Sequence, residues 1–158
     1  MRKKGPIGVA AVLSAIFVLA ACSSDNSTAG GTTPPPTSPA AADGTVSVLL
    51  SQWSVAPSAS SAPAGSITFS VTNEGTMIHE FVVERTDTLA ADIPVKSFEG
   101  EADRIDEDTA GTNDGETGDM AAGATQSLTV DLKPGHYVFF CNLPGHYAQG
   151  MHLDFTVT

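Results

Sequence analysis

Residues 66–72 read SITFSVT, and in this stretch apolar side chains alternate strictly with polar ones. The apolar members are Ile67, Phe69 and Val71. Such an alternation indicates a half-buried β-strand, because successive side chains of a strand point to opposite faces of the sheet. The same period of two recurs in residues 46–50, 128–132 and 151–157.

Turn-forming residues separate these stretches at Asn73-Glu74-Gly75, Lys133-Pro134-Gly135 and Pro144-Gly145. No segment shows convincing helical periodicity. Residues 44–158 are long enough for one domain. About six to eight short strands over this length predict an all-β fold, an antiparallel β-sandwich.

The beginning of the chain is typical of an export signal. Residues 1–21 start with the basic run MRKK, continue with an apolar run and end on Leu-Ala-Ala directly before Cys22. The apolar run of roughly 15 residues is short for a spanning helix, which needs about 20; an uncleaved anchor helix is the alternative. The cysteine after Leu-Ala-Ala resembles the bacterial lipobox. This resemblance implies that Cys22 is acylated, and we expect a protein anchored by lipid to the extracytoplasmic face of the cell membrane.

Cys22 is followed by residues 23–43, a stretch of Ser, Thr, Gly, Pro, Ala, Asn and Asp without large apolar side chains; we take 22–43 together as one segment. Such a composition cannot bury enough surface to offset its ordering entropy. We therefore predict a disordered tether with a reach on the order of 25 Å between the lipidated cysteine and the domain.

The chain is acidic, with 18 acidic against seven basic residues. Removal of residues 1–21 takes away three basic residues and no acid, which changes the net charge from −11 to −14. This charge excludes nucleic acid as a partner, because phosphates must be neutralised by Lys and Arg. It favours redox partners with cationic docking surfaces, since a field of one sign steers encounter with the other; the alternative is that the acidity only confers solubility. We expect a monomer.

Residues 99–119 concentrate nine of the acids, with Arg104 as their one basic residue. We interpret this segment as a long, solvated surface loop between two strands. Loops of this length are usually functional or disordered, so a partner-docking surface and simple solvation both stay open.

The cysteines limit the function further. Cys22 and Cys141 are the only two, and if Cys22 carries a lipid then Cys141 has no disulfide partner. An unpaired cysteine in an exported protein indicates a metal ligand or a reactive thiol. A buried structural thiol is the alternative.

The motif around Cys141 favours a metal site. Residues 139–151 read FFCNLPGHYAQGM, so that four residues separate Cys141 from His146 and four more separate His146 from Met151. A thiolate, an imidazole and a thioether together suit copper, whereas the thioether disfavours zinc. If each residue is considered by itself, Met151 could be a core residue and His146 a turn residue. A trigonal site also needs a second histidine, and His79 stands at the start of a strand after a turn.

The strand register supports this choice. Cys141, Met151 and His79 each lie in register with the apolar residues two positions away in their own strands, so all of them should point to the interior. His152 has the opposite register and should point to solvent. His136 lies about 16 Å from Cys141 along an extended strand, at the other end of the sandwich.

These motifs are similar to those of a known family. Across residues 44–158 the chain resembles the cupredoxins, the small blue copper proteins, in its Cys-x₄-His-x₄-Met loop, in the N-x-G-x-x-x-H segment from Asn73 to His79, and in KPGHYVFFC at 133–141. The loop is most similar to those of the sulfocyanin and rusticyanin branches.

The resemblance implies a Greek-key β-sandwich that holds one type 1 copper. His79, Cys141 and His146 would form the trigonal plane, with Met151 as the weak axial ligand. One position departs from the family: Glu80 stands where an asparagine often braces the cysteine loop.

A site of this kind predicts a one-electron carrier in the cell envelope, with electrons leaving through an exposed edge of His146. The alternative is a copper chaperone or storage protein with the same ligands. The tether at 23–43 lacks the Met or His clusters typical of chaperones. We expect no enzymatic activity, since the sequence has neither a His-x-His pair nor a G-x-S-x-G motif.

Overall fold

The structure is a computed structural model that describes residues 44–98 and 100–158. The predicted export signal at 1–21, the lipidated Cys22 and the tether up to residue 43 lie outside the described residues and stay predictions. Within the described part of the chain, no helix is both long and apolar enough to span a membrane.

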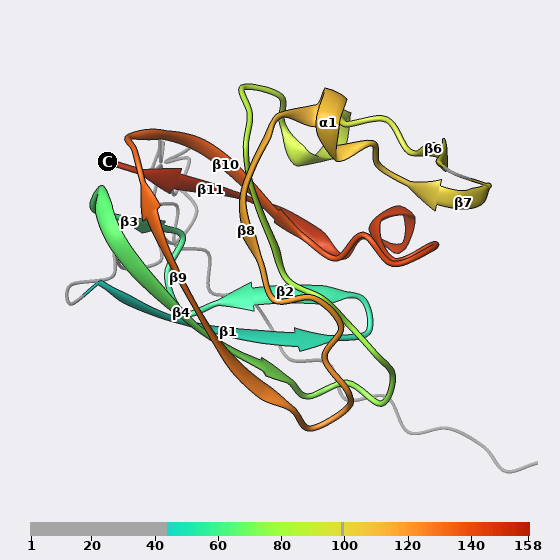
Figure 1. Ribbon diagram of the computed structural model, residues 1–158, viewed down its shortest axis with the longest axis horizontal. Helices are drawn as coiled ribbons and strands as arrows, with labels where there is room; N and C mark the ends of the chain where they lie inside the picture. Colours follow the sequence, from blue (N-terminus) through green and yellow to red (C-terminus); the bar gives the residue numbers. More distant parts are fainter. Residues whose placement is uncertain (1–43, 99) are drawn as a thin grey trace, which may run out of the picture. The chain divides into compact units, whose positions relative to one another are not determined.

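Two sheets make up the domain (Figure 1). The first has the strand order β2-β1-β4-β9, with bounds Ser54–Pro57, Thr45–Ser51, Gly65–Asn73 and Thr125–Leu132. The second has the order β3-β11-β10-β5-β8, with bounds Ser61–Ala62, His152–Val157, Gly135–Phe140, Val82–Arg85 and Thr112–Glu116. The remaining elements are the hairpin of β6 (Lys96–Phe98) and β7 (Glu101–Arg104) and the short helices η1 (Ala90–Asp92), α1 (Glu107–Ala110) and η2 (Tyr147–Gln149).

The predicted β-sandwich is confirmed, but its sheets are mixed and not purely antiparallel. Strand β1 runs parallel to β4, and β3 runs parallel to β11. The reason is the path of the chain: after β2 it contributes β3 to the other sheet and then returns as β4 beside β1. Alternation along a strand reports which face is buried, and it contains no information on the direction of the neighbouring strand.

The core lies between the two sheets and has an aromatic centre. The ring centroid of Phe69 lies 5.4 Å from that of Phe81, 5.2 Å from that of Phe139 and 6.4 Å from that of Phe155. The apolar residues that alternate in the stretches at 46–50, 67–71, 128–132 and 151–157 lie in or against this core, whereas Leu49, at the opposite register in β1, is exposed. The predicted strand faces are therefore confirmed.

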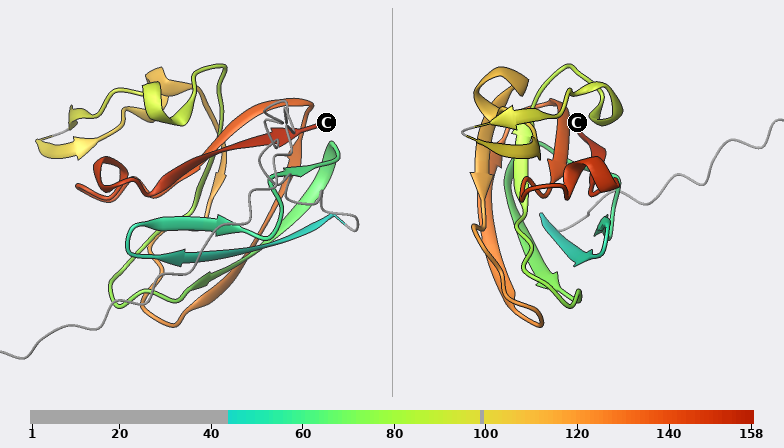
Figure 2. Two further views of the ribbon diagram at one scale, coloured as in Figure 1. Left: turned by 180° about the vertical axis from the view of Figure 1, so that it is seen from behind. Right: turned by 90° about the vertical axis from the view of Figure 1, so that its right-hand side faces the viewer.

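A second apolar cluster covers the outer face of the five-stranded sheet. It joins residues of β5 and β10, such as Val82 and Phe140, to Ile105 and to Tyr147. Figure 2 shows from two sides that the segment with η1, β6, β7 and α1 lies on the side of β10 and β11 away from β1 and β2. This face of the sheet is therefore buried as well.

The prediction of a solvated loop at 99–119 is wrong. This segment contains β7, α1 and β8, and its residue Ile105 is fully buried. Strand β8 reads TNDGE and pairs with β5 through its backbone; it lies at the sheet edge, its four polar residues are exposed, and the fifth residue is Gly115. An edge strand of this kind has no apolar alternation, so its sequence contains no strand signal.

Candidate metal centre

Three of the four predicted ligands converge in the structure. The Nδ1 atoms of His79 and His146 lie 3.2 Å apart, and the Sγ atom of Cys141 lies 3.1 Å from Nδ1 of His146. The donor atoms of all three residues lie within 4.8 Å of one another, and all three residues are buried. Side chains from two distant parts of the sequence thus face one point.

The loop after β10 brings Cys141, His146 and Met151 together. Cys141 directly follows β10, His146 precedes η2, and Met151 directly precedes β11. The N–H of Met151 donates to the carbonyl of His146 at 3.2 Å, and the N–H of Cys141 donates to the carbonyl of Met151 at 3.1 Å. The loop is closed by its own backbone, and Met151 is fully buried beside the other ligands. The predicted positions at strand ends are confirmed.

His79 is held by a different set of contacts. It exchanges two backbone hydrogen bonds with Met120, of 3.1 and 2.7 Å. The Nδ2 group of Asn73 donates to the carbonyls of Met77 and Met120, and its Oδ1 accepts from the N–H of Gly75. Asn73 therefore fixes the segment before the histidine and joins it to Met120, the residue paired with His79, which gives the N-x-G-x-x-x-H pattern a physical reason.

Burial controls the protonation of the three converging side chains. Burial lowers the pKa of His79, and the neighbouring His146 lowers it further. Burial also lowers the pKa of His146 and raises the pKa of the Cys141 thiol to about 11. Near pH 7 all three groups are thus neutral in the absence of an ion, because a low-dielectric site disfavours any uncompensated charge. With a cation bound by these residues, Cys141 would serve as the deprotonated thiolate ligand and both histidines as neutral ligands.

The donor set fits copper. The Nδ1 atoms of His79 and His146 and the Sγ atom of Cys141 face one another, so three donor atoms converge on one buried point. Two imidazoles, one thiolate and one thioether are the ligands of a type 1 site. His79, Cys141, His146 and Met151 thus form the arrangement that takes one copper ion.

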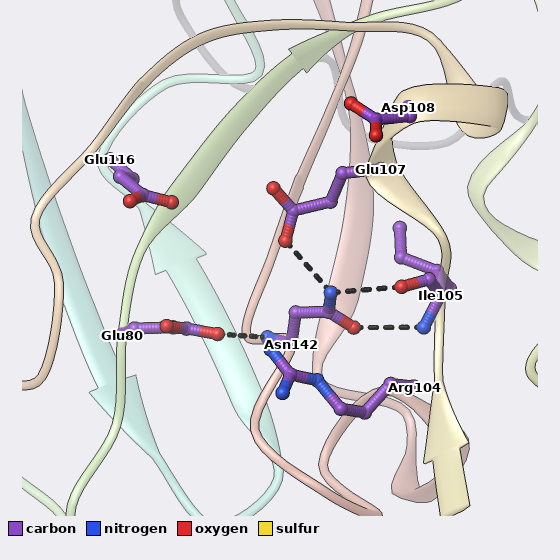
Figure 3. Close-up of a pocket in the computed structure, with 7 residues that line it drawn as sticks. All are labelled: Glu80, Arg104, Ile105, Glu107, Asp108, Glu116 and Asn142. Atoms are coloured by element: carbon purple, nitrogen blue, oxygen red, sulfur yellow. Dashed lines mark hydrogen bonds between the residues drawn. The ribbon is translucent and has the colours of Figure 1, made fainter. Parts of the chain in front are cut away.

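Glu80, which stands where the family often has an asparagine, also stabilises the cysteine loop (Figure 3). Its Oε1 atom accepts a hydrogen bond of 2.8 Å from the N–H of Asn142, the residue after Cys141. Its own N–H points at the Cys141 sulfur, 3.4 Å away. The carboxylate of Glu80 therefore contacts the loop at the position where the resemblance implies an asparagine.

Asn142 is a residue that the sequence reasoning missed. Its side chain exchanges two hydrogen bonds with the backbone of Ile105, of 2.8 and 3.0 Å, and donates a third to Glu107 at 2.8 Å. Figure 3 shows these three bonds converging on one amide. They tie the cysteine loop to the acidic segment, and no sequence pattern indicated that these two regions are neighbours.

A cleft of about 320 Å³ opens beside this network. Its lining is Glu80, Arg104, Ile105, Glu107, Asp108, Glu116 and Asn142. Burial raises the pKa of Glu80 to about 7, and the carboxylates of Glu107 and Glu116 contribute to the rise. The lining of the cleft is therefore mainly acidic, and it includes Asn142, the residue next to the ligand Cys141.

The prediction of an exposed His146 edge is wrong. Only 8% of His146 is exposed, because the indole of Trp53 lies against it with ring centroids 5.0 Å apart and planes at 69°. Trp53 belongs to the two-residue turn between β1 and β2. Nothing in the sequence indicates that this turn meets the ligand loop, which lies about ninety residues further along the chain.

The two remaining histidines are not ligands, as predicted, but His152 does not point to open solvent. His136 lies at the start of β10 and contacts the carbonyl of Thr86 and the carboxylate of Asp154. His152 is half-buried and stacks on Tyr147, with centroids 4.4 Å apart. The second apolar cluster covers this face of β11. A side chain on the face opposite to the core, such as that of His152, is therefore not fully exposed to solvent.

Comparisons with known proteins agree with this site. Among solved structures, a reduced auracyanin from Roseiflexus castenholzii is 25% identical with a TM-score of 0.56, and the match covers 75% of this chain and 99% of that one. Auracyanin B is 26% identical with a TM-score of 0.54, covering 72% and 88%. Reduced rusticyanin shares the fold at 20% identity and a TM-score of 0.52, covering 75% and 83%. A comparison with curated proteins finds no match.

The family comparison covers most of the domain. The family described as copper binding proteins, plastocyanin/azurin family, matches residues 54–158. This range includes all four ligands and every strand except β1. The chain therefore belongs to the plastocyanin/azurin family of copper-binding proteins, the cupredoxins.

Proposed function

We propose that this copper electron-transfer protein is a one-electron carrier in the cell envelope, held at the outer face of the cytoplasmic membrane by a lipid on Cys22. The single observation that supports the carrier role is the site itself. Three donor atoms from two distant segments lie assembled within 4.8 Å of one another in a buried, hydrogen-bonded frame.

Preassembly favours electron transfer, because a site that barely rearranges between two oxidation states exchanges electrons quickly. The ligand loop is closed by backbone bonds between Cys141, His146 and Met151. Asn73 fixes the segment before His79, and Asn142 anchors the loop from outside. When copper is bound, it supplies the one-electron Cu(I)/Cu(II) couple, and the chain supplies the fixed geometry.

The same burial argues against a copper chaperone. A chaperone passes its ion by ligand exchange, and the incoming ligand must reach the metal. Here His79, Cys141 and Met151 are fully buried, and His146 lies beneath Trp53. Delivery would require the ligand loop to open. We therefore favour a carrier without enzymatic activity over a chaperone or store.

The charge of the chain supports redox partners with cationic surfaces. Four carboxylates, those of Glu80, Glu107, Asp108 and Glu116, line the cleft beside the cysteine loop with a single basic residue. Opposite charges accelerate encounter and orient the two proteins. The cleft would thus guide the acidic face of a monomeric, membrane-tethered carrier toward a basic partner.

The test is stopped-flow oxidation of the Cu(I) domain by a basic cytochrome c, with copper content measured before and after. We expect fast oxidation with the metal retained, and an intense visible charge-transfer band in the oxidised form. Cys141→Ser should abolish the band. A colourless Cu(II) form, or slow oxidation together with ready transfer of Cu(I) to a copper-free acceptor protein, would show that the carrier assignment is wrong.

A further inference from the structure

Trp53 is the only tryptophan of the chain, and it lies where the metal site meets the surface. Trp53 is 37% exposed, whereas His146 beneath it is 8% exposed. The other three ligands are fully buried. On this side of the molecule, the indole therefore lies between the His146 ring and the surface.

The turn that carries Trp53 is tied to the opposite ligand segment. The Nε2 group of Gln52 donates to Oγ1 of Thr76 at 2.6 Å, and the N–H of Thr76 donates to Oε1 of Gln52 at 3.3 Å. Thr76 lies three residues before His79. One two-residue turn thus contacts the surroundings of both histidine ligands, and this link holds the indole in place over His146.

We infer that Trp53 is the surface contact through which His146 exchanges electrons with a redox partner; this rests on the carrier function proposed above. One electron passes from Cu(I) through the imidazole and the indole to the oxidised metal centre of the partner. The copper becomes Cu(II), the partner is reduced by one electron, and no bond or proton is transferred. The indole stays in its ordinary closed-shell state throughout and acts only as the medium between the two centres.

The chemistry of the indole fits this role. Electronic coupling between two redox groups falls steeply with the through-space distance between them. An aromatic ring in contact with a buried imidazole ligand shortens this distance between the ligand and a partner. Tryptophan is also enriched among residues that dominate the affinity of interfaces. The occupant that fits is a small one-electron metalloprotein with a basic surface, because the carrier is strongly acidic.

The experiment compares Trp53→Leu and Trp53→Phe with the wild type. The Cu(I) forms are oxidised by ferric basic cytochrome c, and each rate is corrected for the reduction potential measured for that variant. We expect Trp53→Leu to react about tenfold more slowly and Trp53→Phe to keep most of the rate, since truncation of a central tryptophan weakens an interface by at least this factor. The matched control is Leu89→Ala, another apolar residue at the surface, 54% exposed before η1, which should leave the rate unchanged.

A second measurement needs neither a variant nor electron transfer. In the ¹⁵N-labelled Cu(I) protein the single indole N–H resonance belongs to Trp53. Addition of ferrous cytochrome c, which cannot accept an electron, should shift or broaden this resonance at the same concentration as the backbone amides around it. The dissociation constant from this titration should rise about tenfold in Trp53→Leu, followed through those amides.

The outcomes separate the two ideas. If the wild type exchanges electrons with copper retained, but Trp53→Leu keeps both the corrected rate and the affinity, the inference about Trp53 is overturned and the carrier role stands. The inference about Trp53 is also overturned if the indole resonance does not shift while backbone amides elsewhere do. This measurement uses the wild type, so it holds even if the leucine variant fails to fold. If the wild type itself does not exchange electrons, the carrier role fails first.

Discussion

At the residue scale, Gly75 shows how tightly the ligand His79 is enclosed. A Cβ atom added at position 75 would lie 2.8 Å from Nε2 of His79 and 2.8 Å from Oε1 of Gln52. Real Cβ contacts are not this short, so either the imidazole or the Gln52 turn has to move. Because position 75 has no side chain, the His79 ring and the Gln52 side chain can both lie close to it.

We expect Gly75→Ala to weaken copper binding and to alter the visible band. Forcing one extra carbon into a packed site costs roughly 1–3 kcal/mol, which corresponds to about a tenfold or greater loss of affinity. A competition titration against a copper chelator measures the loss. Ala121→Ser is a control at an exposed position in the connection before β9, and it should bind like the wild type. Unchanged affinity in Gly75→Ala would mean that the His79 ring is not confined as described.

At the scale of the element, β5 carries a buried acid that the sandwich does not compensate. Glu84 is fully buried, and neither of its carboxylate oxygens has a hydrogen-bond partner. Burial, together with the nearby carboxylates of Glu107, Asp108 and Asp114, raises its pKa to about 8. Since the folded pKa lies above the unfolded value of 4.5, the proton on Glu84 stabilises the fold at low pH.

The stabilisation by this proton is fully present below pH 4.5 and is lost as the pH rises toward about 8. Glu84→Met keeps the side-chain length and removes the charge, so its unfolding free energy should exceed that of the wild type increasingly across this range. Near pH 8 the gain should be about 1–3 kcal/mol, the usual cost of an unpaired buried polar group. Denaturant unfolding at pH 6 and pH 8.5 measures both values, and a difference that does not change with pH would contradict the prediction.

The elements also show what could be predicted and what could not. The alternation in β4 and β11 fixed which side chains are buried, and the order of Cys141, His146 and Met151 was sufficient for the ligand loop. Strand β8 was missed because it is polar and is held by backbone pairing with β5. Trp53 and Asn142 were missed because their contacts join segments far apart in the chain, and no local pattern reports such contacts.

At the scale of the whole molecule, the anchor at Cys22 remains a prediction from the sequence. A single acyl chain holds a protein only marginally, and stable attachment needs a second one; a diacylated cysteine meets this need. Cys22→Ser should leave the precursor uncleaved or release the protein into the soluble fraction. Membrane fractionation shows where the variant is located, and its mobility on a denaturing gel shows whether the leader has been removed. A variant that stays on the membrane with its leader removed would place the anchor elsewhere.

The charge of the whole molecule predicts how the rate of electron transfer responds to salt. With a net charge of −11, or −14 without the leader, encounter with a basic cytochrome should slow as ionic strength rises, since exposed charges more than about 10 Å apart are screened at 0.1 M salt. If the cleft beside the cysteine loop guides docking, the position of a lost charge matters as well as its number. Asp108 is exposed and lines this cleft, whereas Asp131 is exposed on β9 of the other sheet.

Asp108→Asn and Asp131→Asn remove the same charge, so the pair separates local docking from the general field. We expect Asp108→Asn to lower the rate at low salt by about two- to fivefold, as a loss of up to about 1 kcal/mol implies, and to flatten the salt dependence. Asp131→Asn should change both much less. Stopped-flow rates from 10 mM to 500 mM salt provide the comparison. Equal effects of the two variants would mean that the acidity acts only through the net charge and that the acidic cleft makes no specific contact with the partner.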